Sequence, residues 1–266
     1  MEVGIAVEPY FRTLHLPFDA YRPNSADLVL TDRAADVLTK RCMAARRETW
    51  REITETDVGD VRYITHRRRY GLAEDEVARR VGYHLPQDPG VLFVRRLRAE
   101  RDSDLRPTAR VAAYGKDGKG GCVKEALDYV NRFALTEDRA FVHRLGTQTF
   151  DSAWTRPAAE RAVEQWSSCM AMAGFAYKGP GEAGIISQWG GPASKPTPQE
   201  IATATADVKC KKATNLVPIL VRVESKLQEQ VLRQEKEKFA AIAARIGQMR
   251  SRLTSIVQGS SSGVTL

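Results

Sequence analysis

Apolar positions along most of the chain recur every three or four residues, which is the spacing of one face of an α-helix. This pattern predicts helices over residues 31–53, 72–81, 122–135, 136–154 and 158–173, and from Pro198 through Cys210. Three flanking residues support these bounds: Thr31 as an N-cap, Pro157 as a first helical residue, and Gly174 as a C-cap. We therefore expect a mainly α-helical protein.

The longest helical pattern runs from about Val217 to Gln258. A helix of about 40 residues would extend roughly 60 Å, which exceeds the width of a domain of this size. It either packs along the whole body, bends, or projects toward a partner. The sequence LRQEKEK interrupts its apolar stripe between Val231 and Phe239. We expect the stripe to form a coiled-coil-like contact with a partner through Leu227, Val231, Phe239, Ile242, Ile246, Met249 and Leu253.

Two short segments are candidates for β-strands and give the predicted fold a minor β content. Residues 91–97 read VLFVRRL, and the weaker candidate, residues 110–114, reads RVAAY. The glycines of YGKDGKGGC do not have the spacing of a phosphate-binding loop, and we expect them to turn the backbone into the helix after Cys122.

Four segments follow from these patterns. Residues 1–30 form an extended N-terminal arm, whose aromatic sequence PYFRTLHLPFDAY either lies across the core or is exposed to a partner. Residues 31–152 form a first helical half, which contains Cys42 and Cys122. Residues 153–258 form a second half with Cys169 and Cys210, and residues 259–266 are a disordered tail. The Gly/Pro-rich link before Pro198 contains Trp189 and should fold back on the helices.

The chain has four cysteines, none of them in a C-x-x-C pair. The four histidines do not cluster near them at zinc-ligand spacing; they are His15, His66, His84 and His143. The pattern therefore favours two disulfides in an oxidising compartment, with four buried thiols in a cytosolic protein as the alternative. Cys169 and Cys210 lie on two helical patterns that flank an irregular link, which indicates a helical hairpin with one disulfide. Cys42 and Cys122 form a looser copy of this arrangement.

The chain carries 41 Lys and Arg against 33 Asp and Glu, which gives a net charge of +8. This excess favours anionic partners such as nucleic acid, acidic lipid or a cell-wall polymer, and it also serves solubility. The densest basic patch is His66, Arg67, Arg68, Arg69 and Tyr70. Its arginines either bind a phosphate or carboxylate, or pair with the acids of the next helix. Those acids are Glu74, Asp75 and Glu76.

The sequence contains no motif of a known catalytic or nucleic-acid-binding site. G-x-S-x-G, H-E-x-x-H, the P-loop, RNP-like strands and zinc fingers are all absent. We therefore expect no catalytic residue, metal or cofactor, and we disfavour nucleic acid as a partner. No run of about 20 apolar residues is present, and residues 1–10 do not read as a signal peptide. If the protein is exported, we expect this chain to be the mature form with an added Met.

A series of short motifs resembles a group of secreted or lipid-anchored actinobacterial proteins, especially streptomycete-like ones. The resemblance covers about residues 30–250, and its motifs are distinctive as a series. They are RCM at residues 41–43, RRYGL at 68–72, VGYHLP at 81–86, GGCVKEA at 120–126, WSSCMAMAGFAY at 166–177 and ADVKC at 206–210. The resemblance implies export to the cell surface and paired cysteines, but no activity. The first Cys-Met is followed by AARRETW and lacks the Gly-Phe-Ala-Tyr end that follows Met172-Ala173, so an internal repeat is better supported in the second half.

Of the three possible pairings, we predict Cys42–Cys122 and Cys169–Cys210, because each joins neighbours within one half. We expect a non-enzymatic extracytoplasmic protein, secreted or anchored through a removed or lipidated N-terminus. It would act at the cell surface through the long helix and the basic patch. Its partner would be another protein, a copy of itself, or a membrane complex to which it is an accessory. The alternatives are a secreted enzyme or toxin-like effector with an unrecognised site, and a protein that binds an anionic cell-wall polymer or nucleic acid.

Overall fold

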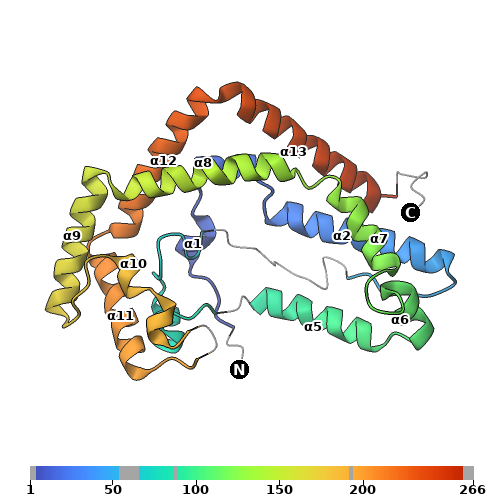
Figure 1. Ribbon diagram of the computed structural model, residues 1–266, viewed down its shortest axis with the longest axis horizontal. Helices are drawn as coiled ribbons and strands as arrows, with labels where there is room; N and C mark the ends of the chain where they lie inside the picture. The colour runs from blue at the N-terminus through green and yellow to red at the C-terminus, as the bar shows by residue number, and fades with distance from the viewer. Residues whose placement is uncertain (1–3, 54–65, 87–88, 192–193, 260–266) are drawn as a thin grey trace. The chain divides into compact units, whose positions relative to one another are not determined.

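The computed structural model of the chain describes residues 4–53, 66–86, 89–191 and 194–259 (Figure 1). These residues contain twelve α-helices, two short 3₁₀-helices and no β-strand. The chain divides into two compact units. Unit 1 comprises residues 1–18, 64–89 and 143–235, and unit 2 comprises residues 19–63, 90–142 and 236–266. The mainly α fold is confirmed, whereas the units alternate along the chain and do not follow the predicted halves 31–152 and 153–258.

Unit 1 is built around α9 (Pro157–Met172), α11 (Pro198–Ala213) and α12 (Leu216–Gln234), which pack on one another. The short helix α4 (Asp75–Val81) packs on α11. Buried side chains from several of these helices form its core, including Trp166, Met170, Val208, Leu216 and Leu220. A disulfide between Cys169 and Cys210, with an S–S distance of 2.01 Å, joins α9 to α11 as predicted.

The N-terminal stretch of unit 1 packs into this core. It contains α1 (Pro9–Thr13) and the start of the 3₁₀-helix η1 (Pro17–Tyr21). Its apolar side chains are buried, namely Ile5, Val7, Phe11, Leu14, Leu16 and Phe18. The link before α11 forms α10 (Pro180–Ala183) and the 3₁₀-helix η2 (Ile186–Trp189). As expected, it folds back on the unit, because Trp189 stacks on Tyr83 with ring centroids 5.8 Å apart.

Unit 2 is centred on α2 (Ser25–Ala45), which packs against α7 (Gly121–Asn131) and α13 (Lys236–Val257). The helix α6 (Pro107–Tyr114) packs on α7. A disulfide between Cys42 and Cys122, with an S–S distance of 2.02 Å, joins α2 to α7 and is the second predicted pairing. Residues 136–142 of α8 (Thr136–Trp154) also belong to this unit, while the rest of α8 belongs to unit 1.

Helix α2 begins six residues before the predicted N-cap Thr31. Its N-cap is Asn24, which accepts a hydrogen bond from the Asp27 backbone N–H, while the Asp27 carboxylate accepts one from the Asn24 backbone N–H. This reciprocal capping box satisfies two N–H groups that the helix itself leaves without partners. The hydroxyl of Thr31 instead donates to the Asp27 carbonyl oxygen inside the helix.

Both predicted strands are helical. Residues 91–97 lie in α5 (Pro89–Ser103), and residues 110–114 lie in α6. A proline stands at the first position of each helix, where its fixed φ angle is favourable and its missing N–H costs nothing. A short apolar run does not by itself distinguish a strand from a helix. In these two segments the proline was the better signal.

The predicted C-terminal helix is two helices, because α12 ends at Gln234 and α13 begins at Lys236. The break falls in LRQEKEK, where residues 233–238 are all polar or charged and exposed. The α13 part of the proposed partner stripe is buried in unit 2: Phe239, Ile242, Ile246, Met249 and Leu253 are at most 6% exposed. The other two residues, Leu227 and Val231, are half-buried on α12. The α13 stripe is therefore core, because α13 packs on α2. Among the described helices, none combines the length and the apolar composition needed to cross a membrane.

Candidate binding pocket

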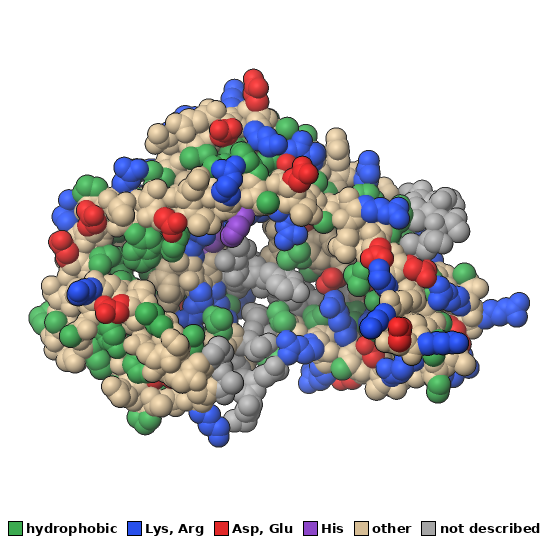
Figure 2. All heavy atoms as spheres, viewed as in Figure 1, with side chains coloured by type: hydrophobic (Ala, Val, Ile, Leu, Met, Phe, Trp, Pro, Cys, Tyr) green, Lys and Arg blue, Asp and Glu red, His purple; other side chains and the backbone are tan. Residues whose placement is uncertain are grey.

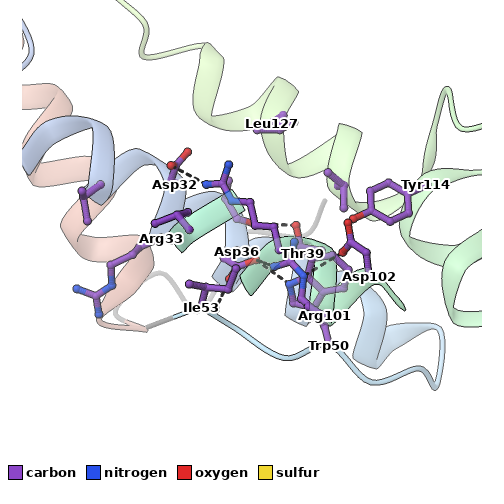
Figure 3. A pocket seen from close by; sticks show the side chains of 15 residues that line it. Asp32, Arg33, Asp36, Thr39, Trp50, Ile53, Arg101, Asp102, Tyr114 and Leu127 are labelled. Carbon is purple, nitrogen blue, oxygen red and sulfur yellow. Dashed lines mark hydrogen bonds and ion pairs between the residues drawn. The ribbon is translucent and has the colours of Figure 1, made fainter. Parts of the chain in front are cut away.

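A pocket of about 250 Å³ lies within unit 2, among residues of α2, α5, α6 and α7 and the segment that follows α2 (Figure 3). Its walls combine apolar side chains with arginines and aspartates. They include Val29, Ala35, Val94, Val123 and Leu127 on the apolar side, and Asp32, Arg33, Asp36, Arg98, Arg101 and Asp102 on the charged side. Trp50 and Tyr114 add two aromatic rings. The pocket is thus mainly apolar, with a set of charges along its wall.

The carboxylate of Asp36 organises the charged wall. It accepts hydrogen bonds from the Trp50 indole N–H at 2.8 Å, the Ile53 backbone N–H at 2.7 Å, and Arg101 Nη1 at 2.9 Å. The Arg101 guanidinium also lies over the Trp50 ring, 3.9 Å from its centroid. These contacts tie the segment after α2 to both α2 and α5.

Two further ion pairs join charged side chains that line the pocket. Arg98 Nη2 lies 2.8 Å from Asp32 Oδ2, and Arg101 Nε lies 3.2 Å from Asp102 Oδ1 (Figure 3). Burial raises the pKa of Tyr114 to about 12, and its hydrogen bond to Asp102 acts in the same direction. The Tyr114 hydroxyl therefore stays protonated at neutral pH. Because the polar groups bind one another, the pocket suits an apolar group better than an ion.

Helix α5 forms ion pairs with α2 through two of its arginines, Arg98 and Arg101. Its apolar side chains Leu92, Val94 and Leu97 are only half-buried, and Phe93 is 36% exposed. Across the pocket, Leu127 of α7 is 43% exposed. Of these side chains, Val94 and Leu127 line the pocket.

The predicted basic patch is a turn whose ends are buried in unit 1. His66 and Tyr70 are each 3% exposed, and the three arginines between them are partly buried. Arg67 Nε lies 2.7 Å from Glu74 Oε2, which is the predicted pairing with an acid of the next helix. Tyr70 donates to Glu224 Oε2 at 2.7 Å, and burial is the main cause that raises its pKa.

The partner of Arg69 was not predicted. It is Glu224 of α12, which is 155 residues away in sequence and also accepts from Tyr70 and Gln228. Asp75 pairs with Lys212 of α11, and Glu76 pairs with Arg80 of its own helix. Over the visible face of the molecule, Lys and Arg side chains are spread out with Asp and Glu among them (Figure 2).

A second buried network of hydrogen bonds in unit 1 was also not predicted from the sequence. Lys211 Nζ lies 2.9 Å from Asp207 Oδ2, and the Asp207 carboxylate also accepts from Trp166 and Tyr83. Burial raises the pKa of Asp207 and lowers that of Lys211, because it disfavours both charged forms. One signal was available: Asp207 and Lys211 are four residues apart on an apolar helix face. Similarly, Asp32 and Asp36 are four residues apart on α2, and Arg98 and Arg101 are three residues apart on α5, so each pair lies on one face of its helix.

No three or more His, Cys, Asp or Glu side chains among the described residues are grouped as metal ligands would be. The chain has two disulfides. Because disulfides persist in oxidising compartments, they indicate an extracytoplasmic environment. No protein-family model, curated protein or solved structure matches this chain.

Proposed function

We propose that this chain is a non-enzymatic protein of the extracytoplasmic space that acts by binding another protein through the pocket of unit 2. The observation that carries the proposal is the composition of this pocket. Its walls are largely apolar, and its carboxylates and guanidiniums bind one another, as the Asp36–Arg101 and Asp32–Arg98 pairs do. Burying an additional charge there would be unfavourable, whereas an apolar side chain would gain from leaving water.

The charge of the chain argues for a different protein as the occupant over a second copy. Two copies would each carry +8, so they repel one another at low ionic strength. A partner with an acidic surface would be attracted. We therefore propose a partner that inserts an apolar side chain into the pocket and surrounds it with acidic residues. Export to the cell surface, as a secreted or lipid-anchored protein, is part of the same proposal.

Site-specific photo-crosslinking tests this proposal. A photoreactive amino acid replaces Leu127, which lines the pocket, in cells that produce the protein. The control position is Val111 of α6, which is also exposed, at 44%, and does not line the pocket. We expect one discrete adduct from position 127 and none from position 111. An adduct of twice the chain's own mass would show self-association and would overturn the choice of partner.

The identified partner is then purified, and its affinity is measured for the wild type, Val94→Asp and Val111→Asp. Val94→Asp places a charge in the apolar wall and should weaken binding roughly tenfold or more, which corresponds to about 1.4 kcal/mol. Val111→Asp makes the same change outside the pocket and should leave affinity unchanged. Equal affinities for all three proteins would rule out the pocket as the binding site.

A further inference from the structure

A second pocket, within unit 1, contains a guanidinium that has no carboxylate partner. This pocket has a volume of about 370 Å³ and is lined by Arg68, Arg69, Thr147 and Phe150. It combines residues of the basic turn with residues of α8. Of its two guanidiniums, Arg69 is paired with Glu224, whereas Arg68 forms no ion pair with a described carboxylate.

The other basic groups around the turn each pair with a carboxylate. Arg67 pairs with Glu74, and Arg69 pairs with the fully buried Glu224. Lys211 pairs with Asp207. In each case one cation faces one carboxylate, so the three pairs are neutral.

Arg68 is the exception. Its one hydrogen bond runs from Nη2 to the backbone carbonyl oxygen of His84 at 2.9 Å, and its Nε is buried without an acceptor. Within the described part of the chain, no carboxylate lies at salt-bridge distance from Arg68. The nearby carboxylate of Glu200 accepts from the Tyr83 N–H and lies 3.5 Å from His84 Nε2. Arg68 is therefore a partly buried cation that forms no ion pair with a described carboxylate.

Burial lowers the pKa of Arg68 to about 10, and the charge of Glu74 partly opposes this effect. The guanidinium is still protonated at neutral pH. An unpaired buried charge is costly, and an anion that binds beside it removes much of that cost. Arg68, Arg69 and Glu224 together carry one net positive charge, so a ligand with a single negative charge balances them.

The size and the remaining lining indicate what carries that negative charge. A volume of about 370 Å³ falls in the range of small-molecule sites and exceeds what a bare inorganic ion fills. Phe150 supplies an apolar surface, and the Arg69 guanidinium lies 5.1 Å from its ring centroid. The hydrogen bonds that Arg69 forms with described residues involve Nε and Nη2 and leave Nη1 unused. The Thr147 hydroxyl already donates to the His143 carbonyl oxygen at 3.2 Å.

We propose that this pocket binds an organic monoanion, namely a carboxylate carried on an apolar or aromatic group. The carboxylate accepts hydrogen bonds from Arg68 and from Nη1 of Arg69, and the apolar group lies beside Phe150. Guanidinium forks match carboxylates in geometry, which makes arginine well suited to this role. This site is separate from the pocket of unit 2 and does not depend on the function proposed above.

Binding of benzoate to the full chain tests the proposal. It is measured by isothermal titration calorimetry at pH 7 and constant ionic strength, with benzamide as the uncharged analogue and chloride as the bare anion. We expect saturable binding of benzoate and none of the other two. Arg68→Gln should weaken benzoate binding roughly tenfold or more, because it removes a charge-assisted hydrogen bond to the carboxylate. Arg79→Gln removes the same charge from an exposed position of α4 and should leave binding unchanged.

A second variant keeps the test decisive if Arg68→Gln does not fold. Thr147→Glu places a carboxylate at an exposed position that lines the pocket, and Gln148→Glu makes the same change at the next exposed position of α8. We expect Thr147→Glu to have a higher melting temperature than Gln148→Glu and to lose benzoate binding. The proposal is overturned if the wild type does not bind benzoate saturably, if benzamide binds equally, or if both glutamate variants bind benzoate like the wild type.

Discussion

The ammonium group of Lys211 has two buried partners in unit 1. Its Nζ donates to the Leu72 carbonyl oxygen at 2.7 Å and to Asp207 Oδ2 at 2.9 Å, and both charged side chains are at most 1% exposed. In such a pair, the loss of one partner leaves the other charge buried and alone. The intact pair adds little net stability, whereas removing one partner alone is strongly destabilising.

Single substitutions at this pair should be strongly destabilising. Lys211→Met should lower the free energy of unfolding by about 3–5 kcal/mol, because Asp207 remains buried without its cation. The double variant with Asp207→Asn should cost less than the sum of the two single variants, because it leaves no unpaired charge. Urea unfolding of the four proteins in this cycle measures the difference. Additive losses would show that the two side chains do not act as a pair.

The carboxylate of Asp138 should make stability depend on pH. The hydrogen bonds from Arg245 lower the pKa of Asp138 below its ordinary value of 3.8, despite the opposing effect of burial. The unfolded chain therefore takes up this proton at a higher pH than the folded protein does. The stabilisation is complete above the unfolded pKa, and it is lost as pH falls through the folded pKa.

Asp138→Asn should consequently reduce the loss of unfolding free energy between about pH 5 and pH 3. Arg245→Gln should have the same effect, because it removes the donor that lowers the pKa. Asp151→Asn, at an exposed position of the same helix, should follow the wild-type curve. Urea midpoints measured across this pH range provide the test. Parallel curves for the wild type and Asp138→Asn would contradict it.

Single residues show which details can be predicted from sequence. The Arg67–Glu74 pair was predictable because the partners are seven residues apart and the acid opens the next helix. Arg69 has Glu224 as its partner, and nothing local to either residue identifies the other. The N-cap of α2 was misplaced because Thr31 and Asn24 both precede acidic residues, and only the Asn24–Asp27 pair completes a capping box.

Among the helices, α2 and α7 hold unit 2 together, and their disulfide closes a long loop. Cys42 and Cys122 are 80 residues apart, and the chain-entropy model assigns about 4.5 kcal/mol to such a bridge. We expect Cys42→Ala/Cys122→Ala to lower the free energy of unfolding by up to this amount.

Non-reducing peptide mapping of the wild type should recover Cys42 joined to Cys122 and Cys169 joined to Cys210. A link from Cys42 to either of the other two cysteines would contradict the fold.

Helix bounds were predictable where caps agreed with periodicity, and less so elsewhere. Helix α8 covers Thr136–Trp154 as predicted, and α9 begins at Pro157 because proline is favourable at a first helical position. The run VLFVRRL of α5 resembled a strand because its side chains are not sorted into a fully buried and a fully exposed face. The pocket of unit 2 explains this pattern, since α5 contacts α2 through Arg98 and Arg101. Of the apolar side chains in this run, Val94 lines the pocket.

At the scale of the whole molecule, periodicity shows that a helix has an apolar face but not which helix covers it. The apolar stripe of α13 was predicted to meet a partner, and its partner is α2 of the same chain. Asp27 and Arg250, which join these two helices, are 223 residues apart. For the same reason, the predicted boundary near residue 152 did not reproduce units that each combine three stretches of sequence.

Each unit has its own buried core and its own disulfide, which leads to a prediction for the intact protein. Removing one disulfide should loosen the unit that contains it and leave the other unit largely unchanged.

In Cys42→Ala/Cys122→Ala, amide hydrogen exchange should accelerate in α2, α7 and α13 of unit 2 and stay near wild-type rates in α9 and α11 of unit 1. In Cys169→Ala/Cys210→Ala, the pattern should reverse. Local opening free energies measured by native-state exchange report on such cooperative units separately. If either variant accelerates exchange equally in both sets of helices, the chain unfolds as one cooperative body, and the alternation of units along the sequence has no counterpart in stability.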